Sequence, residues 1–115
     1  MCGIFGIIGN NKQNEEDIKK LAGFAARRGR DSSGILSYNK EYKINKADLS
    51  IKELIKKIDY KDSDLFLGIG RLITNDDNQN QPYSEGKICI FHNGIIVNDN
   101  QIFKNEKLKR KSKLD

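Results

Sequence analysis

The sequence predicts a single α+β domain in which helices pack on sheets with substantial antiparallel pairing. A chain of 115 residues has the length of one domain. Several short runs are rich in β-branched and aromatic residues, as in buried strands, and two segments repeat apolar residues with the period of a helix. Because the predicted strands outnumber the helices and mix with them, we expect a layered arrangement.

The N-terminal part of the chain predicts a strand followed by a helix. Cys2–Ile8 is an apolar run whose glycines permit close approach of another backbone. Residues 10–14 are polar and turn-like, and three acidic residues after Asn14 suit a helix N-terminus. The helix is expected to end near Gly29, where the basic residues of 27–31 suit a helix C-terminus. Its apolar side consists of Ile18, Leu21, Ala22 and Ala25.

The next segment predicts a hairpin and a second helix. Ser33–Tyr38 and Glu41–Lys46 are typical of two strands joined at residues 39–40. Ser50 and Glu53 have the spacing of a capping box, in which the serine hydroxyl bonds a backbone N–H of the first helical turn. The apolar side of this helix consists of Ile51, Leu54, Ile55 and Ile58.

The remainder of the chain predicts three further strands separated by polar segments. Leu65–Ile69 is typical of a buried strand, and Asn75–Asn80 of a polar loop. Lys87–Phe91 and Ile95–Val97 are apolar runs that predict strands on either side of residues 92–94.

Charge and composition exclude several classes of function. The net charge is +5, of which the basic segment 104–115 contributes +4, so residues 1–103 are nearly neutral. This distribution argues against the domain as a nucleic-acid binder. Residues 98–111 favour a weak helix with little apolar surface.

No apolar run approaches the roughly 18 residues of a membrane span. Two cysteines 87 positions apart do not form a disulfide framework, which favours the cytoplasm.

Cys2 is the first candidate for chemistry. Removal of Met1 before this small residue would leave a cysteine with a free α-amino group. That single residue would supply both a nucleophilic thiol and a nearby base, with no histidine needed. Position alone favours the plainer interpretation, in which Cys2 is a small apolar residue of a strand.

His92 is the one histidine of the chain. Cys89-x-x-His92 has the spacing of two metal ligands, and Cys2 would make a third, which is still short of a closed zinc site. A packed or hydrogen-bonded histidine is the stronger interpretation, and pairing of His92 with Cys2 or Cys89 stays open. No metal or other cofactor is expected.

Two further segments carry groups suited to negative charge. Asn93-Gly94 favours a plain hairpin turn, but an Asn side-chain amide and a Gly N–H are also good donors to an oxyanion. Arg71 ends a predicted strand and is followed by Thr74 and Asn75, which together suit an amino-acid carboxylate. A surface arginine beside a turn is the plainer interpretation of Arg71.

Taken together, these segments resemble the class II glutamine amidotransferase domain. The resemblance is carried by MCGIFGIIG (1–9), RGRDSSG (28–34), GRLIT (70–74), NQPY (80–83) and HNGIIVN (92–98). The segments occur in the family's order and span nearly the whole chain. One segment alone would be a weak signal, whereas the combination is specific.

The resemblance implies a fold and an activity. The fold is that of the N-terminal nucleophile hydrolases, a four-layer αββα sandwich with two antiparallel sheets between helical layers. The activity is that of a glutaminase half, which hydrolyses glutamine to glutamate and ammonia for transfer to an acceptor. The partner implied is therefore glutamine as a small-molecule substrate.

The resemblance also implies roles for individual residues. Cys2 would be the nucleophile, with its own α-amine as general base, and Asn93 and Gly94 would form the oxyanion hole. Arg71 would hold the α-carboxylate of glutamine. The same match places Thr74, Asn75 and Asp115 beside the substrate, and Arg28 and Gly29 beside the nucleophile.

The sequence differs from the family pattern in two respects, both in the C-terminal half of the chain. The family's threonine is often followed by His-Gly or Asn-Gly, whereas Asp76 follows residues 74–75 here. The family domain is also usually longer, and residues 112–115 look like the start of its next motif, whose Asp holds the substrate α-amine. We therefore expect residues 1–115 to be the N-terminal part of the domain, with the sandwich incomplete in this chain.

Two other hypotheses compete with the glutaminase. A non-catalytic remnant or split subunit would need a partner to complete the domain and would expose apolar sheet edges. A basic-tail module would use residues 104–115 to contact an anionic surface or RNA, although a solvated tail is the plainer interpretation. The acceptor of ammonia is expected in a domain that this chain lacks or on another chain.

Overall fold

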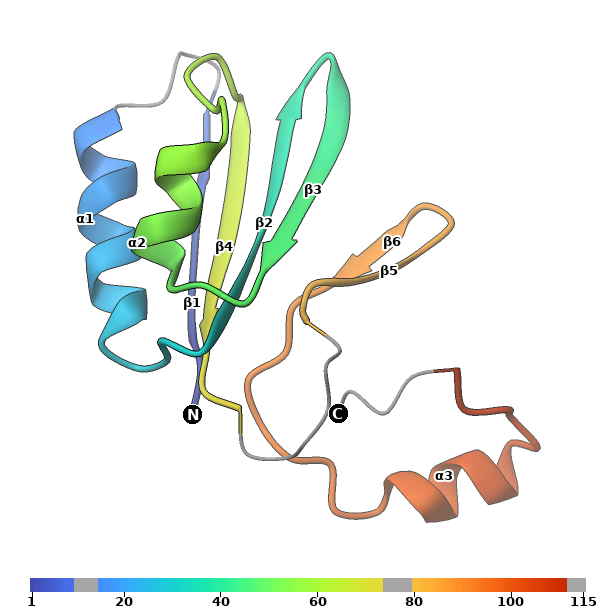
Figure 1. Ribbon diagram of the computed structural model, residues 1–115. Coiled ribbons are helices and arrows are strands. Elements are labelled where there is room, and N and C mark those ends of the chain that lie inside the picture. The colour runs from blue at the N-terminus through green and yellow to red at the C-terminus, as the bar shows by residue number, and fades with distance from the viewer. Residues whose placement is uncertain (10–14, 74–79, 112–115) are drawn as a thin grey trace.

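Antiparallel strand pairing organises the fold. The computed structural model describes residues 1–9, 15–73 and 80–111. They form a four-stranded sheet and a separate two-stranded hairpin, with every pair of strands antiparallel. Two helices cover one face of the larger sheet, and the hairpin lies toward its other face (Figure 1). The α+β class with antiparallel sheets is confirmed, and the four-layer sandwich stays a prediction.

The larger sheet has the strand order β1-β4-β2-β3. Its strands are β1 (Gly3–Ile8), β2 (Ser32–Asn39), β3 (Glu41–Ala47) and β4 (Leu65–Arg71). The predicted hairpin is confirmed as β2 and β3, which turn at Lys40 with a positive φ of 62°. The predicted strands at the N-terminus and in the middle of the chain are confirmed as β1 and β4, so the sheet follows from local apolar runs.

Both predicted helices are present, but the second begins differently from the prediction. They are α1 (Glu15–Ala26) and α2 (Ile51–Leu54), and α2 tightens into the 3₁₀ helix η1 (Ile55–Lys57). The Ser50 hydroxyl makes no capping hydrogen bond, so the capping-box bond is wrong. The reason is that the Glu53 N–H already donates to the Ser50 carbonyl oxygen at 2.9 Å.

The core lies between the two helices and the sheet. The predicted apolar sides of the helices supply much of it, and aromatic rings fill its centre. The Phe66 ring lies 5.9 Å from that of Phe5 and 5.4 Å from that of Tyr60, measured between centroids. The buried members of this cluster are Ile18, Ala22, Ala25, Ala26, Ile35, Ile51, Leu54, Ile55, Tyr60 and Phe66.

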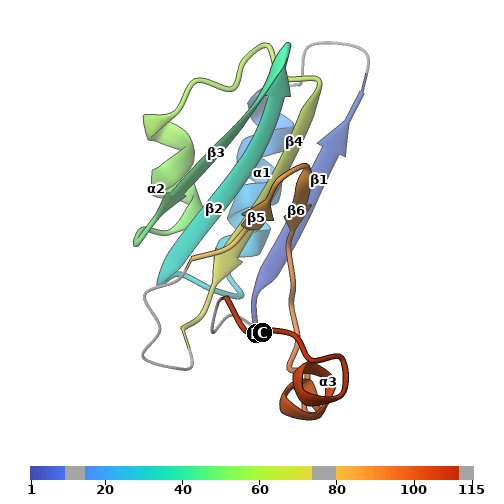
Figure 2. The same cartoon turned by 90° about the vertical axis from the view of Figure 1, so that its right-hand side faces the viewer.

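The C-terminal part of the chain follows the prediction in part. It contains β5 (Tyr83–Glu85), β6 (Ile88–Ile90) and α3 (Asp99–Asn105). Strand β6 lies within the strand predicted at 87–91, and α3 lies within the helix predicted at 98–111. The hairpin of β5 and β6 lies in front of the larger sheet in Figure 2. The strand predicted at Ile95–Val97 is wrong, because this segment is irregular and its ends are 78% and 91% exposed. The β-branched residues there have no neighbouring strand within the described residues, so propensity alone does not make a strand.

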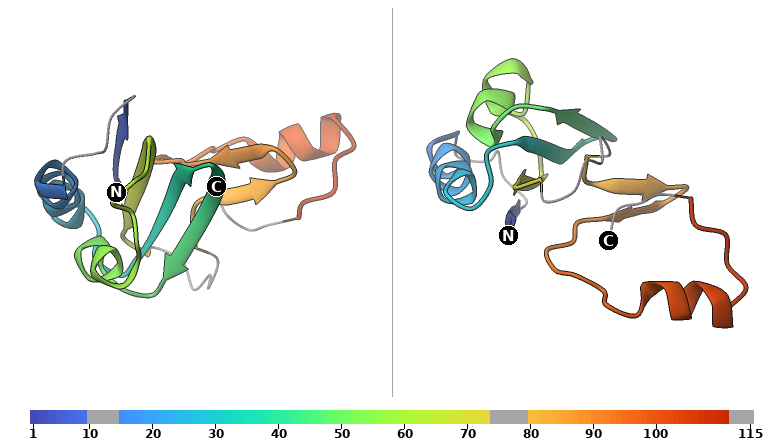
Figure 3. Two further views of the ribbon diagram at one scale, coloured as in Figure 1. Left: turned by 90° about the horizontal axis from the view of Figure 1, so that it is seen from above. Right: turned by 60° about the horizontal axis from the view of Figure 1, so that its bottom comes forward.

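Helix α3 extends away from the rest of the molecule (Figure 3). None of its residues is buried. The radius of gyration is 14.9 Å, whereas a compact chain of this size has about 13 Å. In the part of the chain that the structure describes, no helix is long and apolar enough to cross a membrane. The predicted turn at 10–14 and residues 75–79 of the predicted polar loop lie outside that part.

Glycines allow the C-terminal end of α1 to lie directly on the sheet. A Cβ placed on Gly3 would lie 2.6 Å from both the Cα and the carbonyl oxygen of Ala25. A Cβ on Gly70 would lie 2.8 Å from the carbonyl oxygen of Gly29. Real Cβ atoms do not approach backbone this closely, so a side chain at either position would push the helix away from β1 and β4.

We expect Gly3→Ala to lower the free energy of unfolding by about 1–3 kcal/mol, because the added methyl group overpacks the contact with α1. Gly23→Ala, within α1 itself, is the matched control, since its new Cβ would lie 3.6 Å from the nearest atom, the Lys52 Cε. That change should raise the free energy of unfolding by about 0.5–1 kcal/mol through helix propensity. Urea denaturation measures both, and equal stability of Gly3→Ala and the parent would contradict the proposed packing.

Candidate active site

The register of the larger sheet brings Cys2 and Arg71 together. Gly3 of β1 pairs with Gly70 of β4. Cys2, which precedes Gly3, therefore lies beside Arg71, which follows Gly70. Residues opposite each other on antiparallel strands face the same side of a sheet. Two side chains that are 69 positions apart therefore come to one end of the sheet. Arg71 also pairs with Ser32 of β2 on its other side.

Asn93 reaches the same end of the sheet from the segment after β6. Its side-chain Oδ1 accepts a hydrogen bond from the Cys2 backbone N–H at 2.9 Å. This bond joins residues separated by 91 positions. Because the Oδ1 atom accepts this bond, the Nδ2 group is the part of the Asn93 amide that can donate to another acceptor.

Arg28 and Gly29 fix the other side of the nucleophile candidate. The Arg28 Nε donates to the Cys2 carbonyl oxygen at 3.2 Å, and its Nη2 lies 3.7 Å from the Met1 sulfur. Gly29 is buried, and a Cβ there would lie 2.5 Å from the Leu72 nitrogen. The turn after α1 therefore contacts both the start of β1 and the end of β4.

Cys2, Arg71 and Asn93 line one small cavity. It has a volume of about 110 Å³. Its lining consists of Met1, Cys2, Arg71, Leu72, Gln81, His92, Asn93, Gly94 and Ile95. A second hollow of about 310 Å³ also borders Cys2 and is lined by Arg28 among others.

The structure thus gathers four residues predicted for the site, Cys2, Arg71, Asn93 and Gly94, around one cavity. The placement of the predicted Thr74, Asn75 and Asp115 lies outside the described residues.

Asp31 is a residue of the site region to which the sequence analysis gave no role. Its backbone N–H donates to the Arg71 carbonyl oxygen at 3.0 Å, and its Oδ2 accepts from the Ile73 N–H at 2.7 Å. Asp31 therefore holds the chain at the Arg71 carbonyl group and again two residues further on. The sequence feature that could have indicated this role is an acidic residue between the end of a predicted helix and a predicted strand, inside the segment 28–34.

Gln81 is the second residue without a predicted role. Its Oε1 accepts a hydrogen bond from the His92 backbone N–H at 2.7 Å. The side chain is only 7% exposed and lines the small cavity. The sequence feature that could have indicated this role is a glutamine directly before the single proline of the chain. Local sequence patterns do not show which residue its side chain contacts.

Cys89 differs from Cys2 in its surroundings. Partial burial on β6 raises the pKa of the Cys89 thiol, and the positive charge of Lys46 opposes this shift. A raised pKa keeps the thiol protonated and weakens it as a nucleophile. Within the described residues there is no group of three or more His, Cys, Asp or Glu side chains arranged to hold a metal ion.

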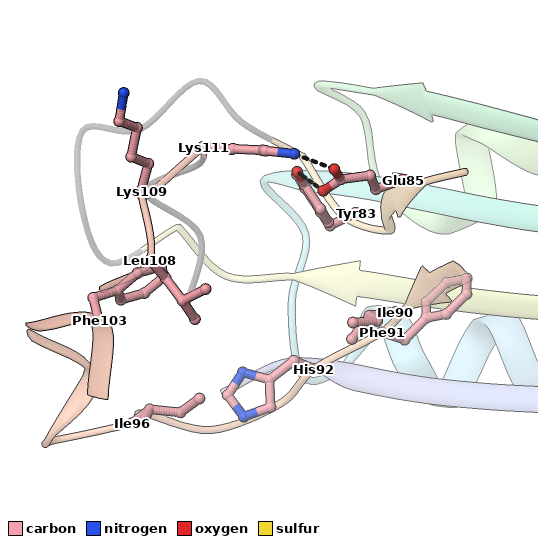
Figure 4. A pocket seen from close by; sticks show the side chains of 10 residues that line it. All are labelled: Tyr83, Glu85, Ile90, Phe91, His92, Ile96, Phe103, Leu108, Lys109 and Lys111. Atoms are coloured by element: carbon pink, nitrogen blue, oxygen red, sulfur yellow. Dashed lines mark hydrogen bonds and ion pairs between the residues drawn. The ribbon is translucent and has the colours of Figure 1, made fainter. Parts of the chain in front are cut away.

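A larger cavity of about 540 Å³ lies between the β5–β6 hairpin and α3 (Figure 4). Glu85 bonds to Lys111 and accepts from the Tyr83 hydroxyl at 3.2 Å. The bond to Lys111, with a smaller contribution from the Tyr83 hydroxyl, lowers the pKa of Glu85. The bond to Glu85 raises the pKa of Lys111. Arg110 likewise pairs with Asp99. Two cations of the basic segment are thus paired with carboxylates.

Comparison with known proteins identifies relatives. No family model and no solved structure matches the chain. The glutamine–fructose-6-phosphate aminotransferase (isomerizing) of Methanococcus maripaludis is 38% identical over 106 residues, covering 85% of this chain and 17% of that protein. The enzyme of the same name from Pyrococcus horikoshii is 38% identical over 122 residues, covering 96% and 19%. The 7-cyano-7-deazaguanine synthase of Saccharolobus solfataricus is 34% identical over 133 residues, covering 100% and 28%. The chain therefore spans less than a third of each of these relatives.

We expect Asp31→Ala to speed hydrogen exchange at the Ile73 amide, because the acceptor of that N–H is lost. The free energy of unfolding should fall by about 0.5–1.5 kcal/mol. Asp31→Asn keeps an oxygen acceptor and should retain most of the protection. Amide exchange followed by NMR checks this, and an unchanged Ile73 rate in Asp31→Ala would refute the assigned contact.

We expect Lys111→Met to raise the pKa of Glu85 toward its ordinary value, as measured by NMR titration. Lys109→Met, which removes a neighbouring cation of the same cavity, is the control and should leave the Glu85 titration unchanged. Because the folded pKa of Glu85 lies below the unfolded one, the pair stabilises the fold above the unfolded pKa. That stabilisation is lost as the pH falls through the folded pKa. A Glu85 titration that is the same in Lys111→Met and the parent would rule out the pair.

Proposed function

Because the chain belongs to the class II glutamine amidotransferase family, we propose that it forms a glutaminase site that hydrolyses the side-chain amide of glutamine. The observation that carries the proposal is the 2.9 Å hydrogen bond between the Cys2 nitrogen and the Asn93 Oδ1. It sets a candidate nucleophile and a candidate oxyanion donor beside one cavity that also contains Arg71. On this proposal, residues 1–115 are the N-terminal part of an amidotransferase domain.

Removal of Met1 is the first step of the proposed chemistry. With Met1 attached, the Cys2 nitrogen is a peptide amide that cannot take up a proton. Its release turns this nitrogen into an α-amine, which is a base in the neutral range. Asn93 Oδ1 would then accept one N–H of the amine, which leaves the nitrogen lone pair for the Cys2 thiol proton.

The reaction proceeds through a covalent intermediate. The α-amine takes the thiol proton, and the Cys2 sulfur attacks the side-chain carbonyl carbon of glutamine to form a tetrahedral oxyanion. The Asn93 Nδ2 and the Gly94 N–H donate to that oxyanion. When the C–N bond breaks, the protonated α-amine of Cys2 gives its proton to the leaving nitrogen of the substrate, and ammonia departs. Water then hydrolyses the thioester, which gives glutamate and restores the thiol.

Arg71 is proposed to bind the substrate rather than to take part in bond breaking. Its planar guanidinium suits a bidentate contact with the α-carboxylate of glutamine. Asp31 would hold the backbone that follows Arg71, through the Arg71 carbonyl oxygen and the Ile73 N–H. We propose Thr74, Asn75 and Asp115 as further substrate contacts, and Arg28 and Gly29 as neighbours that hold Cys2 in place.

The acceptor of ammonia is proposed to lie in a domain outside this chain. The relatives named above are aminotransferases of fructose 6-phosphate and a synthase of 7-cyano-7-deazaguanine, so their names point to different products. The similarity to these enzymes favours the glutaminase over a non-catalytic remnant. Glutamine hydrolysis is the function that we assign to the chain, and no acceptor is assigned.

The test is release of ammonia and glutamate from glutamine by protein whose first residue is shown by mass spectrometry to be Cys2. We expect Cys2→Ala to abolish turnover, because the nucleophile is lost. Cys89→Ala is the matched control, since it removes the other thiol of the chain and should retain turnover.

A form that keeps one extra residue before Cys2 separates the two roles of that residue. It retains the thiol but lacks the α-amine, so we expect it to lose turnover as well. Absence of ammonia release by the verified parent, or equal release by Cys2→Ala, would refute the proposal.

A further inference from the structure

The segment around Gln81 connects the larger sheet to the loop that carries Asn93. The Asn80 Nδ2 donates to the Asp48 Oδ1 at 2.7 Å, just beyond the end of β3. Pro82 is fully buried. A Cβ on Gly34 of β2 would overlap the backbone carbonyl of Gln81, so this segment lies directly on the strand. The position of Gln81 is therefore set by the sheet.

The Gln81 side chain transmits this position to the loop. Its Oε1 accepts from the His92 N–H at 2.7 Å, one residue before Asn93. Asn93 is in turn bound to the Cys2 nitrogen at 2.9 Å. Two consecutive residues of the loop are thus tied to the sheet. His92 is tied through Gln81, which packs against Gly34 of β2, and Asn93 is tied through Cys2, just before β1. Residues 91–98 contain no helix or strand of their own, so side-chain contacts must define their course.

We propose that Gln81 is a positioning residue for the oxyanion hole. Its side-chain carbonyl fixes the backbone at His92 and thereby the place of Asn93 and Gly94 relative to Cys2. The inference rests on the proposed glutaminase function for its kinetic consequence but not for its geometry. An error of about 1 Å in such donors costs on the order of 100-fold in rate. The loss should appear in kcat, because the oxyanion forms after glutamine has bound.

Three variants test this role. Gln81→Met keeps a side chain of similar length but removes the acceptor, and we expect kcat to fall by about 10- to 100-fold with little change in KM. Gln81→Glu keeps an oxygen acceptor for the His92 N–H and should recover most of the lost rate. Gln101→Met makes the same replacement at an exposed position of α3 and should leave both constants unchanged.

A second measurement separates positioning from general disruption. Iodoacetamide alkylation of Cys2 needs no oxyanion hole, so its rate should stay within about twofold of the parent in Gln81→Met. A parallel loss of alkylation and kcat would indicate a structural defect and overturn the proposal. A parent-like kcat in Gln81→Met, or an equal loss in Gln81→Glu, would also overturn it.

An NMR measurement keeps the inference independent of turnover. In Gln81→Met we expect faster exchange of the His92 amide and shifted resonances of the Asn93 side-chain amide. Unchanged signals at both residues would refute the positioning role. If the parent shows no glutaminase activity while these signals shift, the proposed function fails and the positioning of the loop by Gln81 stands.

Discussion

Direct contact between the end of α1 and the backbone of the sheet is the constraint on which the rest of the structure depends. Gly3, Gly29 and Gly70 make it possible, since a Cβ at any of them would lie within about 3 Å of backbone atoms. The contact aligns the start of β1 with the end of β4. That alignment puts Cys2 beside Arg71, and it leads the turn after α1 back to the nucleophile candidate through Arg28.

Side-chain oxygen atoms then attach the loops to this frame. Asp31, Gln81 and Asn93 each accept a backbone N–H from a segment distant in sequence, at 2.7, 2.7 and 2.9 Å. A backbone N–H outside the regular ladders needs an acceptor, and a side-chain oxygen from another segment satisfies it while holding the two segments together. The site is therefore held by polar contacts at its rim and by glycine packing beneath it.

The sequence predicted what depends on local pattern. Strands β1 and β4, the β2–β3 hairpin and the apolar sides of α1 and α2 follow from periodicity and turn residues. The strand expected at Ile95–Val97 is absent because β-propensity needs a neighbouring strand, and β5 was missed because Tyr83–Glu85 is short and polar. The resemblance named the residues that the fold gathers at the cavity. Asp31 and Gln81 received no role, since their partners are 42 and 11 positions away and no short-range pattern shows such contacts.

The separation of 91 positions between Cys2 and Asn93 has a consequence for how the site comes into being. Closing so long a loop requires that the β1–β4 pairing, the turn after α1 and the approach of residues 91–94 are all complete. Contacts of this range form slowly compared with helices and hairpins. Partly folded chains therefore contain Cys2 before its backbone N–H has found Asn93. The assembled site is a property of the finished topology, and the slowest long-range closure sets when it appears.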